Sequence, residues 1–141
     1  MLFLSTPDEL IEWIMKKPHP FVLEDTETAY GYDMGLMQEL TGNAIPERIN
    51  VGLLGINSET IDWDQLEFWL SSLQKKQGEH YYQEQALTAM LLSGMKTEFL
   101  DKNRYQVLPA KSECMDLKAV LHHYVAQSKN DYYLKMWKKT L

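Results

Sequence analysis

The sequence predicts an α/β fold in which a mixed sheet is flanked by helices. Short apolar runs typical of strands alternate irregularly with longer stretches of helical periodicity, which is a layered α/β pattern rather than an all-α one. The 141 residues suffice for one ordinary domain with its own core. Because neither a Gly/Ser linker nor an internal repeat interrupts the chain, a single domain over residues 1–141 is expected.

Composition and charge exclude several classes of protein. With 45% hydrophobic and 24% charged residues, the chain falls in the range of globular proteins. Fourteen basic against twenty acidic side chains give a net charge of −6, which disfavours a nucleic-acid partner held by its phosphates. Cys114 has no cysteine to pair with, and no apolar run approaches the length of a transmembrane segment. These features predict a cytoplasmic location.

The N-terminal part of the chain alternates strand and helix patterns. Residues 1–4 are apolar and predict a buried strand. Thr6, Pro7 and Glu9 are typical of a helix start, and a helix is expected from there to about Lys17. Its apolar stripe is expected to pack on the sheet and consists of Leu10, Ile11, Ile14 and Met15.

Two more strands are expected around a helix over residues 33–41. The apolar runs 20–24 and 48–56 predict the strands, and the second is expected at the centre of the sheet. Gly52 and Gly55 lie within it. Glycine weakens a strand, so these positions indicate a close approach by backbone or ligand, or tight packing against a helix.

Two antiparallel helices are predicted in the middle of the chain, over residues 62–76 and 82–93. Asp62 and Gln65 have the spacing of a capping box. The first helix carries an apolar stripe that is expected in the core: Trp63, Leu66, Trp69, Leu70 and Leu73.

The C-terminal third predicts a hairpin, a strand and a helix. Residues 97–100 and 105–108 are short strand candidates on either side of a polar turn. Residues 119–125 predict another strand, on which adjacent side chains point to opposite faces. A final helix over 131–139 is expected to bury Tyr132, Tyr133, Met136 and Trp137.

Most catalytic motifs are absent from the sequence. It contains no Walker loop, Rossmann glycine motif, Cys-x-x-Cys pair, nucleophile elbow or His-Glu-x-x-His. The polar constellation that remains consists of Asn50 with Gly52, the segment Gln83-Glu84-Gln85, and His122-His123 followed by Lys129. Each of these has a plain structural explanation when taken alone, such as a hydrogen-bonded strand histidine or a solvated lysine.

In order along the chain, these residues resemble the C-terminal half of the retaining, nucleotide-sugar-dependent glycosyltransferases of family 8. Residues 49–57 are similar to that family's Asn-Ser-Gly-Val strand, and Trp63 stands where a tryptophan often starts the next helix. Residues 83–87 are similar to its Asp-Gln-Asp segment, and His123-Tyr124 with Lys129 resembles its His-Phe-x-Gly-x-x-Lys ending. The resemblance covers roughly residues 1–137.

The resemblance implies a partial nucleotide-diphosphosugar transferase fold of the GT-A type and a role for each matching residue. His123 would be a ligand of a divalent metal, Mn²⁺ or Mg²⁺, and Lys129 would contact the diphosphate of the nucleotide sugar. Gly52 would lie on the cofactor side of the cleft, while Asn50, Gln83 and Gln85 would line the site of the sugar acceptor. Convergence of these groups on one cleft is the central expectation.

The resemblance also implies that part of the enzyme is missing. Residues 1–4 resemble the strand that follows the family's Asp-x-Asp metal motif, so the domain is expected to be truncated at its N-terminus, with an incomplete metal site and no activity alone. Val51, Ala126 and Asn130-Asp131 depart from the family pattern. The acidic cluster Glu24, Asp25 and Glu27 is interpreted as a solvated loop or a rim of the acceptor site in preference to a set of metal ligands.

Two other interpretations stay open. One is a non-catalytic module that binds carbohydrate or protein, or forms a homo-oligomer, through exposed aromatic residues: Tyr30, Tyr32, Tyr81 and Tyr82. The other is an unrelated α/β fold in which all the polar residues are structural. Whether the chain is an enzyme, and which sugar and acceptor it would use, is left undecided by the sequence.

Overall fold

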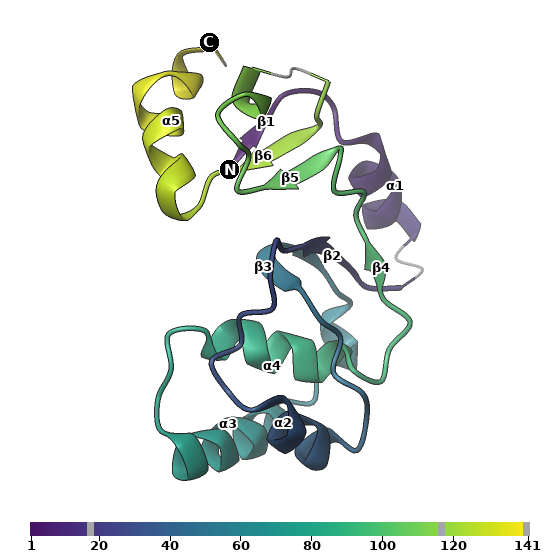
Figure 1. Cartoon of the computed structure of the whole chain (residues 1–141). Coiled ribbons are helices and arrows are strands. Elements are labelled where there is room, and N and C mark those ends of the chain that lie inside the picture. Colours follow the sequence, from purple (N-terminus) through teal and green to yellow (C-terminus); the bar gives the residue numbers. More distant parts are fainter. Residues whose placement is uncertain (17–18, 116–117, 140–141) are drawn as a thin grey trace. The chain divides into compact units, whose positions relative to one another are not determined.

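The computed structural model describes residues 1–16, 19–115 and 118–139 and has a mixed α/β architecture (Figure 1). Its described residues form five α-helices and two three-stranded sheets. The chain divides into two compact units. The central unit is residues 19–98, and the terminal unit combines residues 1–18 with 99–141. The α/β class is therefore confirmed, with two small sheets in place of one.

The sheet of the central unit has the order β3-β2-β4. Strands β2 (Phe21–Glu24) and β3 (Ile49–Gly55) are antiparallel, with an irregularity between Val22 and Leu23. The backbone N–H of Glu98, the first residue of β4 (Glu98–Phe99), donates to Pro20 O at 2.8 Å. The expectation that β3 is the central strand is wrong among the described strands, because β2 is the strand with a partner on each side.

Gly55 is needed because an aromatic ring occupies the place of its side chain. Phe21 lies opposite Gly55 in the β2–β3 register. A Cβ built on Gly55 would lie 2.1 Å from Phe21 Cε1, well inside any permitted contact. The close approach predicted from the sequence is thus made by a side chain from the neighbouring strand, not by a helix or by backbone.

Helices α2 (Met34–Thr41) and α3 (Trp63–Gln77) each begin with an aspartate cap, and the cap of α3 at Asp62 is the one that the sequence predicts. Asp33 Oδ1 accepts from Leu36 N at 2.8 Å, and Asp62 Oδ1 accepts from Gln65 N at 2.9 Å. Gly42 ends α2 in the left-handed conformation with φ 70°, which glycine adopts without strain.

Helix α4 (Gln83–Leu92) packs with α2, α3 and β3 around the core of the central unit. The core includes Val22, Met37, Ile49, Leu73, Ala86, Ala89 and Met90. Trp69 packs against this core, and its Nε1 donates to Leu40 O at 3.2 Å. Trp63, by contrast, is 69% exposed, so its expected place in the core is wrong.

The sheet of the terminal unit has the order β1-β6-β5. Strand β1 (Leu2–Phe3) is antiparallel to β6 (Leu121–His123), and β5 (Tyr105–Val107) is parallel to β6. The expected hairpin of residues 97–100 with 105–108 is therefore wrong, because β4 and β5 belong to different sheets.

The helices of the terminal unit bury less than their sequences predict. Helix α1 (Asp8–Lys16) buries Leu10 but leaves Ile11, Ile14 and Met15 exposed, and its predicted end at Lys17 lies outside the described residues. Helix α5 (Lys129–Leu134) is followed by a 3₁₀ turn, Met136–Lys139. Met136 is buried as expected, whereas Tyr133 and Trp137 are exposed. The break at Lys135, where φ is −136°, ends the regular helix and with it the predicted stripe.

In the described part of the chain, no helix combines the length and the apolar character needed to cross a bilayer.

Candidate functional site

Two of the predicted site residues, Asn50 and Gln85, meet at the carboxylate of Asp25 in the central unit. Asn50 Nδ2 donates to Asp25 Oδ2 at 2.8 Å, and Gln85 Nε2 lies 3.4 Å from the same oxygen. Both amide side chains are only 7% exposed. We call these three residues the Asp25 cluster.

The β2–β3 pairing and helix α4 bring the three residues of the cluster together. Asn50 lies in β3 opposite Leu23 of β2, and Asp25 follows directly after β2. The Asp25 backbone N–H donates to Arg48 O at 2.7 Å, which extends the pairing of the two strands by one step. Gln85 is on the first turn of α4, the helix that packs on β3.

Hydrogen bonds fix the orientation of both amides. The ionised carboxylate of Asp25 can only accept hydrogen bonds. The side-chain nitrogens of Asn50 and Gln85 must therefore face Asp25, and their side-chain oxygens must face away from it. Asn50 Oδ1 then accepts from Gly52 N at 2.9 Å, and Gln85 Nε2 also donates to Ala29 O at 3.1 Å. No hydrogen bond from the described residues reaches Gln85 Oε1, which is left as an oriented acceptor.

The acidic residues around the cluster are engaged by donors. Asp25 Oδ1 accepts from Thr26 N at 2.7 Å, while Arg48 Nη2 pairs with Glu24 Oε1 at 2.6 Å. Hydrogen bonds to a carboxylate are stronger than those between neutral groups. The arrangement therefore anchors the loop after β2 and favours an organising role for Asp25 over that of a metal ligand.

A buried tyrosine supports the same loop. The Tyr30 hydroxyl donates to Pro46 O and accepts from Ile49 N, the latter at 3.2 Å. Burial raises the pKa of Tyr30 to about 12, so the phenol is neutral at physiological pH. Its two hydrogen bonds join the loop after β2 to the start of β3.

Gln83, the third residue expected at the acceptor site, lies apart from the Asp25 cluster in its contacts. Gln74 Nε2 of α3 donates to Gln83 Oε1 at 3.1 Å. Side chains two positions apart on a helix point about 200° apart, so Gln83 and Gln85 leave α4 in different directions. The spacing of two positions therefore directs the side chains of Gln83 and Gln85 away from each other, because both residues are on a helix.

His123 and Lys129 belong to the terminal unit. In β6, His122 is fully buried, with Nδ1 3.1 Å from the Tyr124 hydroxyl, and His123 is half-buried. This alternation is the one expected for neighbours on a strand. Lys129 is exposed at the start of α5. Convergence of these two residues with Asn50 in one cleft stays a prediction.

The described residues do not by themselves fit a tightly held divalent cation. Among residues 1–16, 19–115 and 118–139, no three His, Cys, Asp or Glu side chains are grouped so as to hold a metal ion. Mg²⁺ and Mn²⁺ sites are built mainly from carboxylate and other oxygen ligands. One imidazole from His123 would be a single ligand among several.

Two of the four tyrosines proposed for a binding module are buried, and two are exposed. Tyr30 and Tyr32 are buried, so the expectation that they are exposed is wrong. Tyr81 is 89% exposed and Tyr82 is 41% exposed. The Tyr82 ring stacks on His80, with 5.8 Å between their centroids, just before α4 begins.

Sequence reasoning placed Asn50 and Gln85 in one site but did not identify Asp25 as the residue that joins them. Asp25 follows a strand directly, close to the position at which Asn50 stands in the partner strand. That proximity requires the strand register, which a single sequence does not give.

No family model matches the chain, and neither the curated proteins nor the solved structures contain a match. A functional proposal therefore depends on the residues themselves and on their geometry.

Proposed function

We propose that this chain carries the acceptor-binding part of a nucleotide-sugar-dependent glycosyltransferase, with the Asp25 cluster at the base of the acceptor site. The resemblance to family 8 suggests the reaction class. In this proposal the donor nucleotide sugar and the divalent metal are bound with the help of residues outside this sequence, and His123 and Lys129 contribute from the terminal unit.

The observation that carries the proposal is the meeting of Asn50 and Gln85 at one carboxylate. They were selected from two separate motifs, one on a strand and one at a helix start, 35 positions apart in the sequence. A hydrogen bond and a second, longer contact to Asp25 Oδ2 join them. The resemblance assigns these two residues, from separate segments of the chain, to one site, and their shared carboxylate supports that assignment.

The chemistry of the cluster suits a sugar hydroxyl. Each hydroxyl group of a saccharide can donate one hydrogen bond and accept others. Gln85 Oε1 is oriented as an acceptor, and Asn50 Nδ2 has a second N–H beyond the one given to Asp25. Both amide groups are held by Asp25 Oδ2. They are therefore preorganised to bind a hydroxyl and lose little conformational entropy when they do. Asp25 is thus a positioning residue.

Titration with neutral saccharides tests the acceptor site. Methyl β-D-galactopyranoside and lactose, added to the ¹⁵N-labelled chain, are expected to shift the side-chain amide resonances of Asn50 and Gln85. We expect Gln85→Ala to weaken binding about tenfold, as the loss of an oriented hydrogen bond would. Gln38→Ala, on the exposed surface of α2, is the matched control and should leave the affinity unchanged. If the saccharides shifted other resonances but not the side-chain amides of Asn50 and Gln85, the result would contradict the proposal.

Calorimetry with UDP and Mn²⁺ tests the assignment of the donor side. The proposal expects no measurable affinity for the chain alone, because one imidazole and one lysine do not hold a metal–diphosphate complex. Tight, Mn²⁺-dependent binding of UDP would show that the chain holds a donor site of its own and would contradict this division of roles.

A second candidate is a carbohydrate-binding module without catalysis, which the exposure of Tyr81 and Tyr82 favours. In that case sugars would stack on the tyrosine rings. Tyr81→Ala would then abolish saccharide binding and Gln85→Ala would leave it intact, which is the reverse of the result expected for the Asp25 cluster.

A further inference from the structure

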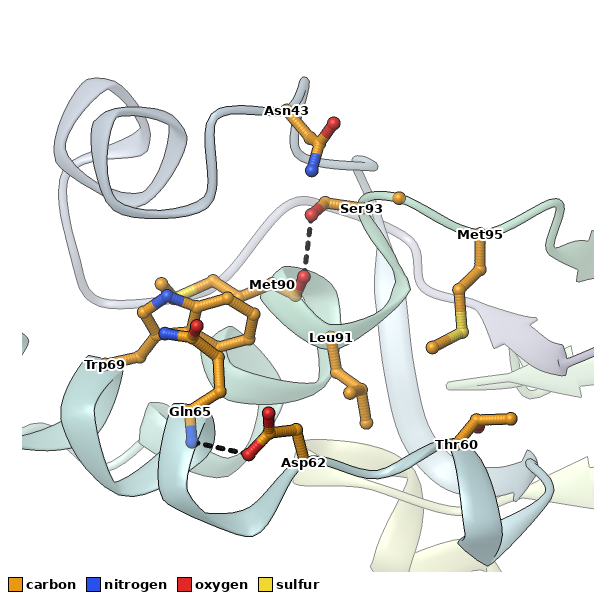
Figure 2. Close-up of a pocket in the computed structure, with 10 residues that line it drawn as sticks. Asn43, Thr60, Asp62, Gln65, Trp69, Met90, Leu91, Ser93 and Met95 are labelled. Atoms are coloured by element: carbon orange, nitrogen blue, oxygen red, sulfur yellow. Dashed lines mark hydrogen bonds between the residues drawn. The ribbon is translucent and has the colours of Figure 1, made fainter.

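A pocket of about 270 Å³ opens in the central unit where α4 ends (Figure 2). Its walls come from α3, from the end of α4 with the segment after it, and from the loop after α2. The cluster residues Asp25, Asn50 and Gln85 are not among those that line it. The pocket is therefore a separate site, and binding there does not depend on the proposed function.

Part of the pocket lining is apolar. Trp69 extends from α3 towards Met90 and Leu91 of α4, with Met95 on the segment after the helix (Figure 2). The indole N–H already donates to Leu40 O, so the ring has no unsatisfied polar atom to offer a ligand. An aromatic surface beside thioether and aliphatic side chains suits a flat, apolar ligand face.

Polar side chains also line the pocket, and three of them have unused hydrogen-bonding capacity. Asp62 Oδ1 caps α3 at Gln65 N, and its second oxygen accepts no hydrogen bond from the described residues. Asn43 Nδ2 donates to Thr41 O at 3.1 Å, which leaves its carbonyl oxygen directed elsewhere. The Gln65 side-chain amide has no hydrogen bond to any described residue. These groups offer acceptors and one pair of N–H donors along the lining.

The charge of the lining restricts the class of ligand. Among the described residues, Asp62 is the one charged residue that lines the pocket, and no described lysine or arginine does so. An anion such as a phosphate would meet a carboxylate with no compensating cation, in a chain of net charge −6. A purely apolar ligand would leave the polar groups of the lining desolvated without partners.

The geometry points to a binding site for one neutral pyranose ring. A pyranose has an apolar face of C–H groups that can lie on the Trp69 indole and a rim of hydroxyls that can meet Asp62, Gln65 and Asn43. The small volume suits a single ring, being below the range typical of larger ligands. The pocket would thus hold a sugar unit at a distance from the Asp25 cluster along α4.

Chemical-shift titration of the full chain tests this site with four probes: methyl β-D-glucopyranoside, methyl β-D-galactopyranoside, glucose 6-phosphate and tetramethylammonium. We expect a neutral glycoside to shift the Trp69 indole N–H and the Gln65 side-chain amide in a saturable manner. Glucose 6-phosphate should bind at least tenfold more weakly, because its charge is uncompensated.

Two variants report on the ligand's contacts without disturbing the fold. Gln65→Ala, a favourable change within a helix, should weaken glycoside binding about fivefold, as expected for one hydrogen bond. Asp62→Asn keeps the helix cap and removes the charge, so glycoside binding should change less than threefold. Gln38→Ala is again the matched control.

Two outcomes would overturn the inference. Saturable binding of tetramethylammonium that is lost in Asp62→Asn, without glycoside binding, would identify a cation site. Glycoside shifts that spare Trp69 and Gln65, or no shifts at 50 mM glycoside, would show that the pocket takes no pyranose. Neither result bears on Gln85→Ala, so this inference and the proposed function can fail separately.

Discussion

The central and terminal units contain the same kinds of element but differ in how they bury apolar helix faces. In the central unit, α4 buries Ala86, Ala89, Met90 and Leu92 almost completely. In the terminal unit, α1 leaves Met15 81% exposed and α5 leaves Leu134 70% exposed. The central unit is one continuous stretch of chain, whereas the terminal unit joins both ends. An apolar stripe therefore predicts a helix better than it predicts what covers that helix.

The largest effect is expected from a leucine in the core of the central unit. Leu73 is fully buried between α3 and its neighbours, so Leu73→Ala removes apolar contacts and leaves a cavity. We expect the free energy of unfolding to fall by about 3 kcal/mol, measured by urea denaturation followed by circular dichroism. Leu134→Ala is the matched change on the terminal unit and should cost less than about 0.5 kcal/mol. Equal costs would break the comparison between the units.

The next effect comes from the contact between Gly55 and Phe21. Gly55→Ala places a Cβ 2.1 Å from the Phe21 ring, and β2 and β3 must shift to admit it. A loss of about 2 kcal/mol is expected for this overpacking. At Gly94 the nearest atom to an added Cβ is Asn43 Nδ2 at 3.5 Å, an ordinary contact, so Gly94→Ala should be nearly neutral. If Phe21→Leu restored the stability of Gly55→Ala, the ring would be identified as the cause.

Alkaline unfolding sharpens the comparison through the buried phenols. Burial raises the pKa of Tyr30 to about 12, above its value in the unfolded chain. The neutral phenol therefore stabilises the fold fully below about pH 10, and this stability is lost as pH rises towards 12. Between pH 8 and pH 11 we expect Tyr30 to account for about 1 kcal/mol of lost stability.

Urea titrations at the two pH values measure this contribution of Tyr30. Tyr30→Phe should lose less stability between them than the parent chain does, although it is less stable at pH 8 because two hydrogen bonds are gone. Some alkaline sensitivity should remain, because burial also raises the pKa values of Tyr105 and Tyr124 in the terminal unit.

The features predicted from the sequence are those that depend on neighbouring residues. The cap at Asp62 was predicted correctly because it is formed within one turn of helix. The pairing of strands β4 and β5 was predicted wrongly. The parallel pairing of β5 with β6 joins segments 16 residues apart, and nothing local distinguishes it from the hairpin that was expected.

The candidate site shows the same division between local and distant information. Asn50 and Gln85 were selected by residue type and order, and both belong to the Asp25 cluster. The role of Asp25, which joins the two amides, could be identified only from the β2–β3 register. The assignment of Gln83 to the same acceptor site stays a prediction, and its side chain is hydrogen-bonded to Gln74 of α3 and not to the Asp25 cluster.

The smallest effect is expected at the tryptophan that was wrongly placed in the core. Trp63 and Trp69 are six positions apart on α3, but Trp63 is 69% exposed and Trp69 packs on the core with its Nε1 bonded to Leu40 O. Trp63→Phe should change the free energy of unfolding by less than about 0.3 kcal/mol. Trp69→Phe leaves Leu40 O without its donor and should cost about 1 kcal/mol. A larger cost at Trp63 than at Trp69 would contradict the exposure of Trp63 and the packing of Trp69 on the core.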